Sequence, residues 1–178
     1  MAKRSLPLAK VYGLLEPGPV VLVTTAARGR PNIMTLSWLT MMEFEPPLIG
    51  CVLSGRNFSF AALKSTRECV INIPSVELAK QVVGCGNTSG REVDKFEHFG
   101  LTPKPASCVA PPLIDECFAN FECKVVDTRL VNKYNFFILE VVKAWKTPSR
   151  VPPRTLHHLG MGTFVVDGEI LKLPSRMK

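Results

Sequence analysis

Short apolar runs rich in β-branched residues recur along the chain, and turn-forming residues close most of them. Residues 20–25 are apolar on both faces, which is typical of a strand buried on two sides. The turn at 27–31 contains Gly29 and Pro31 and leads directly into a second run at 32–38, which predicts a β-hairpin. Further strands are predicted at 48–53, 68–73, 119–131 and 134–145, with a tight turn at 132–133 and a hairpin at 164–171 around Asp167-Gly168.

Two helical patterns interrupt the strands. Apolar residues recur at helical spacing over 58–63, and Asn57 is placed to cap that helix. Residues 76–83 show a similar helical pattern, and Ser75 precedes them as a possible cap. The irregular stretch 85–110 predicts a long loop. Because strands and helices do not alternate steadily, we predict a mainly β fold, an antiparallel barrel with flanking helices packed outside it.

The chain has 178 residues, of which 46% are hydrophobic and 21% charged, so it can bury a sizeable core. This length suits one domain over residues 1–178 and is short for two. No stretch approaches the roughly 20 apolar residues of a spanning helix, and the basic N-terminus has no apolar segment behind it. We therefore expect a cytoplasmic protein that does not associate with membranes.

The net charge of +7 predicts attraction to anions, either nucleic acid, an acidic membrane or a phosphorylated small molecule. The densest basic group is interrupted by prolines and consists of Lys143, Lys146, Arg150 and Arg154. No recognised nucleic-acid motif is present, so a solvated basic loop is the favoured interpretation and no nucleic-acid partner is expected. The six cysteines have no C-x-x-C spacing; we interpret them as reduced, buried thiols and expect no metal site.

The segment 54–59, Ser-Gly-Arg-Asn-Phe-Ser, lies between a predicted strand and a predicted helix. A helix N-terminus offers unpaired N–H groups, glycine permits close backbone approach, and serine and arginine donate to phosphate oxygens. The segment therefore suits a phosphate. An ordinary capped helix with an exposed arginine is the alternative, and spacing alone leaves both open.

Polar residues also interrupt the strand pattern at 30–40. Asn32, Ser37 and Thr40 can hydrogen-bond a flat heteroaromatic ring, because ligand sites are mostly apolar with a few polar groups that fix orientation. Apolar partners for the faces of such a ring follow the same segment: Met34, Leu36 and Trp38. A half-exposed strand rich in serine and threonine is the alternative explanation.

Together these two segments resemble the flavin-reductase-like family, the FMN-binding split barrels that include flavoredoxins and NAD(P)H:flavin oxidoreductases. The resemblance covers most of the chain, in the order 19–25, 30–38, 46–49, 54–56, 70–74, 85–86, 89–96, 100–103 and 110–117. Each string is loose by itself, and the ordered series is specific. The chain lacks the G-x-G-x-x-G motif of a Rossmann nucleotide site.

The resemblance implies a split β-barrel that forms a homodimer, with each FMN near the subunit interface. The residues that it places beside the isoalloxazine ring are Asn32, Ser37, Trp38, Leu39 and Thr40. Those that it places at the phosphate are Ser54, Arg56, Asn57 and Ser59. A further string near the cofactor contributes Ser89, Arg91, Lys95 and Phe96, with Phe96 suited to packing over a ring, and His158 is a candidate ring neighbour or nicotinamide contact. The alternative for Arg91 and Lys95 is a surface loop that forms salt bridges. The alternative for His158 is a loop histidine without a catalytic role.

The function implied is electron transfer through FMN, in which the flavin accepts hydride and the protein supplies orientation and electrostatics. No catalytic acid or nucleophile is expected. One alternative is a flavin reductase that takes electrons from NAD(P)H; the other is a flavoredoxin-like carrier that exchanges electrons only with protein partners. Cys51, on the strand before the phosphate segment, is the candidate for a thiol relay beside the flavin.

Overall fold

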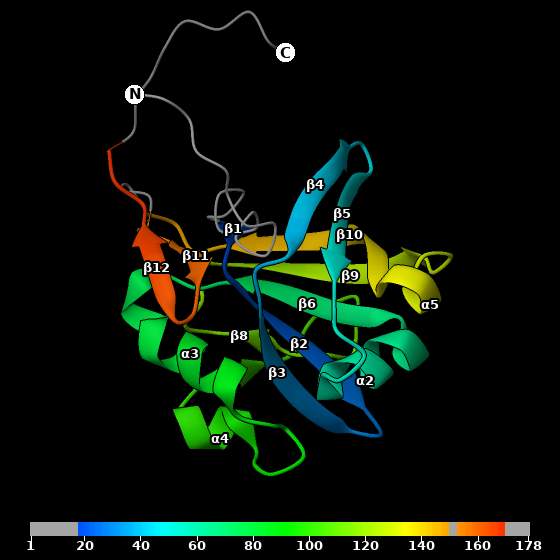
Figure 1. Cartoon of the computed structure of the whole chain (residues 1–178), viewed down its shortest axis with the longest axis horizontal. Coiled ribbons are helices and arrows are strands. Elements are labelled where there is room, and N and C mark those ends of the chain that lie inside the picture. Colours follow the sequence, from blue (N-terminus) through cyan, green and yellow to red (C-terminus); the bar gives the residue numbers. More distant parts are fainter. Residues whose placement is uncertain (1–17, 150–152, 170–178) are drawn as a thin grey trace, which may run out of the picture.

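The computed structural model describes residues 18–149 and 153–169, and a seven-stranded antiparallel sheet forms its centre (Figure 1). Its strands are β2 (Val21–Ala27), β3 (Arg30–Leu36), β4 (Leu39–Phe44), β5 (Pro47–Val52), β6 (Glu68–Ile73), β9 (Ala119–Asp127) and β10 (Phe136–Lys146). They are ordered β3-β2-β6-β9-β10-β5-β4, and every neighbouring pair is antiparallel. The predicted antiparallel, mainly β arrangement is confirmed.

The two edges of this sheet approach each other at Ser37 and Trp38. Strands β3 and β4 lie at opposite ends of the hydrogen-bonded order, yet only these two residues connect them. Three consecutive Cα–Cα steps span at most about 11 Å, so the sheet must bend until the ends of β3 and β4 are close. The Trp38 carbonyl oxygen also accepts a hydrogen bond from the Val52 N–H at 3.0 Å. The bend thus places residues 37–38 at an opening between the two edges.

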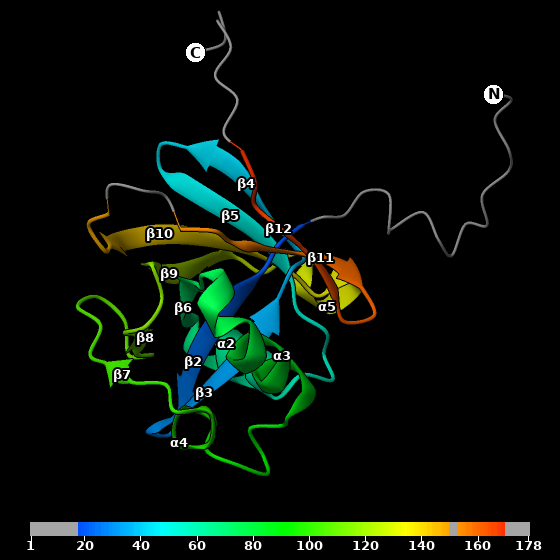
Figure 2. The same ribbon diagram turned by 90° about the vertical axis from the view of Figure 1, so that its left-hand side faces the viewer.

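Strand β4 was not predicted. Residues 40–44 are all exposed, and β4 pairs only with β5, with a register shift between Met41 and Glu43. A strand of this kind carries no alternation of apolar and polar residues, because neither face is buried within one chain. The β4–β5 hairpin projects away from the other strands (Figures 1 and 2).

The predicted β2–β3 hairpin is confirmed, and its turn is tighter than expected. Ala27 pairs with Arg30, which leaves a two-residue loop of Arg28 and Gly29 with φ of 53° and 74°. Both values lie in the left-handed region that a type I′ turn requires. Strand β2 is buried on both faces as predicted, because Val21 and Val23 face one core cluster while Leu22 faces another.

The helices are α2 (Phe58–Thr66), the 3₁₀ turn η2 (Val76–Leu78), α3 (Ala79–Asn87), α4 (Lys95–Phe99) and α5 (Val131–Tyr134). Helix α2 packs on β2 and β3, while α3 and α4 pack on β3. Asn57 precedes α2 as predicted but its side chain makes no capping bond, and Ser75 starts a 3₁₀ turn instead of an α-helix. The predicted loop 85–110 is wrong in part, because Asp94 caps α4 by accepting hydrogen bonds from the Phe96 and Glu97 N–H groups.

The C-terminal hairpin lies earlier than predicted. Strands β11 (Leu156–Gly160) and β12 (Thr163–Val166) are joined by Met161 and Gly162, with φ of 51° and 74°, while Asp167 and Gly168 follow β12 without regular structure. Residues 170–171 of the predicted hairpin lie outside the described residues. Strand β1 (Gly18–Pro19) pairs with β11 to complete a three-stranded sheet.

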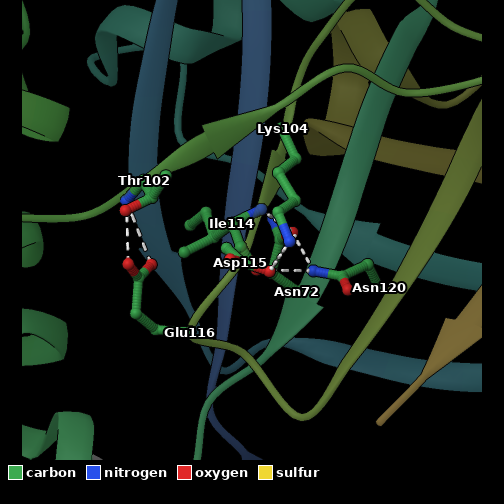
Figure 3. A network of polar contacts seen from close by, with 7 residues as sticks. All are labelled: Asn72, Thr102, Lys104, Ile114, Asp115, Glu116 and Asn120. Atoms are coloured by element: carbon green, nitrogen blue, oxygen red, sulfur yellow. Dashed lines mark hydrogen bonds and ion pairs between the residues drawn. The ribbon is translucent and has the colours of Figure 1, made fainter.

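A polar network fixes the connection between α4 and β9 to the main sheet (Figure 3). The Asn72 Oδ1 accepts hydrogen bonds from the Ile114 N–H at 3.0 Å and from Asn120 Nδ2 at 2.8 Å. Nearby, Lys104 Nζ lies 2.5 Å from Asp115 Oδ1. This network also positions the short ladder of β7 (Pro103–Lys104) with β8 (Leu113–Ile114). No helix in the part of the chain that the structure describes is long and apolar enough to cross a membrane.

Candidate cofactor site

Three adjoining cavities follow strand β3. The first, of about 250 Å³, lies between Asn32, the start of α2 and residues 85–90. The second, of about 370 Å³, lies beside residues 34–38 and Ser54. The third, of about 260 Å³, lies between α3 and the β11–β12 hairpin. Thr35 lines all three, so together they form one groove along the strand.

A buried ammonium forms part of the wall of the first cavity. Lys95 is 5% exposed, and its Nζ donates hydrogen bonds to the Ile33 carbonyl at 2.7 Å and the Cys85 carbonyl at 2.6 Å. Two carbonyls use two of its three donors. Burial lowers the pKa of Lys95, and no carboxylate pairs with it among the described residues. A buried cation without an acidic partner is costly, so the cavity favours an anion.

Neutral donors surround the same cavity. Ser59, in the first turn of α2, is 1% exposed, and its Oγ accepts hydrogen bonds from Asn32 Nδ2 at 2.8 Å and Thr25 Oγ1 at 3.2 Å. The Ser59 hydroxyl hydrogen is then left for a further acceptor. The first turn of α2 carries no acidic residue, so the positive end of the helix dipole borders the cavity uncompensated.

Gly90 brings the segment 85–90 against β3. A Cβ at this position would lie 1.9 Å from Asn32 Oδ1 and 3.0 Å from Phe58 Cδ1. Only glycine permits that approach, which closes the first cavity on one side. Beside it, the guanidinium of Arg91 lies 5.7 Å from the centre of the Phe58 ring.

The far end of the groove is more apolar. Ser37 lines both the second and the third cavity, and Trp38, which is 57% exposed, lines the second. His158 lines the third cavity with its ring 5.3 Å from that of Phe164. The hairpin that carries His158 is fixed by Asp167, whose carboxylate accepts a hydrogen bond from the Thr155 hydroxyl and lies 2.6 Å from His157 Nε2. The hydrogen bond from Thr155 lowers the pKa of the Asp167 carboxyl below its usual range, and the electrostatic interaction with His157 acts in the same direction.

The structure brings most of the predicted site residues together. Around the first cavity lie Asn32, Arg56, Asn57, Ser59, Ser89 and Lys95; Asn57 also lines the second cavity, with Ser37, Trp38 and Ser54, and His158 lines the third. Four others lie elsewhere: Leu39 packs on the main core, Thr40 is exposed on β4, Phe96 is buried beneath the helices, and Arg91 stacks on Phe58. The burial of Phe96 leaves it no free face for a cofactor ring.

Sequence reasoning missed Thr35 and Gly90, although alternating polar residues in β3 and the Ser89-Gly90-Arg91 string were signals for them. It also singled out Cys51, which lines none of these three cavities. All six cysteines are free, and Cys51 is buried in the main core, where burial raises its pKa to about 12. Cys85 is the cysteine that lines the first cavity, and burial raises its pKa to about 11. Neither thiol is poised to ionise at neutral pH.

Comparison with known proteins identifies the family of the chain. The model of the flavin reductase like domain matches residues 14–161. The uncharacterized protein YddH of Escherichia coli strain K12 is 33% identical over 171 residues, which cover 88% of this chain and 90% of that protein.

Two solved structures share the fold over nearly the whole of both chains. One is an FMN-binding domain of a flavin reductases-like enzyme from Shewanella baltica, with a TM-score of 0.82 at 25% identity over 96% of this chain and 97% of the other. The second is flavoredoxin of Desulfovibrio vulgaris, with a TM-score of 0.81 at 25% identity over 97% and 94%. The expected split-barrel fold is confirmed, and the chain belongs to the flavin-reductase-like family of FMN-binding proteins.

Proposed function

We propose that the chain binds FMN in the groove along β3 and transfers electrons through it. The phosphate occupies the first cavity and the isoalloxazine ring extends toward Ser37 and Trp38. The observation that carries the proposal is Lys95, a 5% exposed ammonium in the cavity wall without a carboxylate partner among the described residues. A phosphate dianion supplies the charge that this site lacks.

Bound FMN supplies the redox chemistry, because its ring accepts a hydride and passes electrons on singly or in pairs. The protein's own part is binding and orientation. Lys95 and the Ser59 hydroxyl hold the phosphate, Asn32 orients Ser59, and Met34 and Trp38 offer apolar contacts to the ring. His158 borders the third cavity, where a donor or acceptor molecule would approach the ring.

The reaction that we propose is reduction of bound FMN by NAD(P)H, followed by electron transfer to free flavin or another acceptor. The alternative is a flavoredoxin-like carrier that exchanges electrons only with protein partners. Stopped-flow mixing of the FMN-loaded protein with NADH and with NADPH distinguishes them. Rapid loss of flavin absorbance with either nucleotide supports the enzyme, and its absence together with reduction by a protein donor supports the carrier.

We also propose that the protein is a homodimer whose subunits meet at the β4 arm. Large apolar side chains are exposed there: Met41 at 56%, Met42 at 45% and Phe44 at 81%. An exposed apolar edge strand is a liability in a monomer and an asset at an interface. Trp38 lies at the base of the arm and lines the second cavity, so a second subunit at this arm would complete the ring end of the groove.

A further inference from the structure

The wall of the third cavity that faces α3 is a hairpin outside the seven-stranded sheet. Strands β11 and β12 form this hairpin, and both belong to the separate three-stranded sheet with β1 (Figure 1). The hairpin lines the cavity with His158 of β11, Phe164 of β12 and Gly162 of the turn between them. None of its described residues lines the first or the second cavity. Among the three cavities of the groove, the hairpin therefore shapes the third alone.

The two strands of the hairpin are held unequally. Backbone hydrogen bonds join β11 and the residues before it to other elements: the Val20 N–H donates to the Leu156 carbonyl at 2.9 Å, and the Val76 N–H to the Arg154 carbonyl at 2.8 Å. Strand β12 is an edge strand, and β11 is its only strand partner in the described part of the chain. At the tip of the hairpin, Met161 is 94% exposed. The position of β12 therefore depends on its packing against the core and on the contacts at its base.

Asp167 makes the polar contacts at the base of β12. Its backbone N–H donates to the Thr155 carbonyl at 3.2 Å, and its Oδ2 accepts hydrogen bonds from the Thr155 N–H at 3.3 Å and from the Thr155 hydroxyl. Its Oδ1 lies 2.6 Å from His157 Nε2. Hydrogen bonds to a carboxylate are stronger than those to a neutral acceptor. The Asp167 cluster, which consists of Asp167, Thr155 and His157, therefore joins the end of β12 firmly to the start of β11.

The Asp167 cluster and the third cavity lie on opposite faces of the hairpin. Successive side chains of a strand point to opposite faces, so His157 points away from the face that carries Leu156 and His158. Leu156 is 2% exposed in the second core cluster, and His158 is paired across the hairpin with Phe164. No member of the Asp167 cluster lines the cavity. The cluster acts on the cavity only through the position of the two strands.

We propose that Asp167 is a positioning residue for the third cavity. By holding β12 against β11, it keeps the rings of His158 and Phe164, 5.3 Å apart, in the wall beside which an electron donor or acceptor reaches the flavin. Loss of the Asp167 carboxylate then slows electron exchange and leaves FMN binding unchanged. The effect on electron exchange rests on the proposed function, whereas the positioning of the hairpin does not.

Amide hydrogen exchange of the full chain tests the positioning and requires no flavin. Asp167→Asn keeps the shape of the side chain but removes its charge and one acceptor oxygen. Exchange at residues 156–166 is expected to accelerate about tenfold or more, while exchange in α3 stays the same. The nuclear Overhauser effect between the rings of His158 and Phe164 should weaken with it. Unchanged exchange and an unchanged ring contact in Asp167→Asn would overturn the proposal.

A pair of variants at Thr155 separates the hydrogen bond from side-chain packing. Thr155→Val removes the hydroxyl at nearly constant shape and should accelerate exchange as Asp167→Asn does. Thr155→Ser keeps the hydroxyl and should exchange like the unmodified protein. Asp127→Asn is the matched control, because it breaks an ion pair with Arg129 at the end of β9 and should leave the hairpin unaffected. Equal exchange in the two Thr155 variants would show that the hydroxyl does not hold the hairpin.

Stopped-flow reduction of the FMN-loaded variants tests the consequence for electron exchange. With whichever of NADH and NADPH reduces the unmodified protein, Asp167→Asn should lower the second-order rate constant about tenfold. FMN affinity should change by less than about twofold, and reduction by dithionite, a small ion that needs no docking site, should stay the same. An equal loss of FMN affinity would reveal a general structural role and overturn the proposal. If neither nucleotide reduces the flavin but Asp167→Asn still loosens the hairpin, the proposed NAD(P)H reaction fails and the positioning role stands.

Discussion

Gly90 and Asn32 are so close that a single methyl group on residue 90 would lie 1.9 Å from Asn32 Oδ1. This contact joins the loop after α3 to strand β3, although the two residues are 58 positions apart (90 − 32). Asn32 in turn donates to Ser59 at 2.8 Å, so the position of the loop and the direction of the Ser59 hydroxyl depend on each other.

Gly90→Ala is therefore expected to displace Asn32 and break its hydrogen bond to Ser59. Forcing a methyl group into a packed contact costs roughly 1–3 kcal/mol, so both thermal stability and flavin affinity should fall. Gly168→Ala is the control, because a Cβ there meets nothing within 4 Å. Unchanged FMN affinity in Gly90→Ala, measured by fluorescence titration, would show that this contact does not shape the site.

The pH dependence of flavin binding tests Lys95. Burial lowers its pKa, with the Cys85 thiol acting in the opposite direction, so the ammonium loses its proton earlier than an exposed lysine does as the pH rises. FMN affinity should therefore fall as the pH rises, already below the ordinary lysine pKa of about 10.4, while the affinity for riboflavin, which has no phosphate, stays level. Lys95→Met should weaken FMN binding about tenfold or more at pH 7 and remove the dependence of FMN affinity on pH. If the affinities for FMN and for riboflavin changed equally with pH, Lys95 would not be a phosphate ligand.

The buried carboxylate of Glu122 indicates that the folded protein loses stability in acid. Its carboxylate is fully buried in β9 and accepts hydrogen bonds from the Ser107 N–H at 3.0 Å, the Trp145 Nε1–H at 2.7 Å and the Cys108 N–H at 2.5 Å. Burial raises its pKa, but these donors outweigh burial and the pKa lies below its usual range. Because the folded pKa is lowered, this stabilisation is present above the unfolded value of about 4.3 and is lost as the pH falls through the folded value.

Glu122→Gln replaces the carboxylate by an amide, whose NH₂ group cannot accept hydrogen bonds from the surrounding N–H donors. The free energy of unfolding should therefore fall by about 1.5–3 kcal/mol at neutral pH. Its stability should also vary less with pH in the acid range than that of the unmodified protein. Urea unfolding followed by tryptophan fluorescence at several pH values measures both effects. A variant as stable as the unmodified protein would show that the donors are satisfied in another way.

The exposed β4 arm predicts the assembly state. Phe44→Asp places a charge on a side chain that is 81% exposed in one chain and should convert a dimer into a monomer in sedimentation velocity. Leu130→Glu, at a position 43% exposed outside the arm, is the control and should leave the assembly unchanged. If the unmodified chain sediments as a monomer, the homodimer proposal is wrong.

Buried elements could be predicted from the sequence because their side chains carry a periodic signal. Strand β2 is apolar on both faces and was located to within two residues, whereas β4 was missed because its exposed Met-Met-Glu-Phe stretch has no buried face. Helix α4 is only five residues long, too short for a periodic pattern, although Asp94 was a usable cap signal. At the C-terminus, the Asp-Gly pair outweighed Met161-Gly162 in the prediction, but the backbone turns at the latter pair.

The site was predictable only where residue type and order agreed with the family pattern. Asn32 was chosen as a polar residue that interrupts a strand pattern and Ser59 as a hydroxyl of the predicted phosphate segment, and both line the first cavity. The burial of Lys95 was not visible in the sequence, because a lysine that follows Arg91, Glu92 and Asp94 in a charged string has the pattern of a surface residue. The structure shows that its ammonium donates to the Ile33 and Cys85 carbonyls. Phe96, the next residue of α4, is buried in a core cluster, whereas Lys95 contacts β3 through the Ile33 carbonyl.

Titration of the flavin-free full chain with FMN and with riboflavin tests the central claim most directly. The account predicts that one FMN binds per chain, that visible absorption and flavin fluorescence change together, and that riboflavin binds at least about tenfold more weakly because it lacks the phosphate. A chain that takes up no FMN, or that binds riboflavin equally well, would contradict the assignment of the first cavity as a flavin phosphate site.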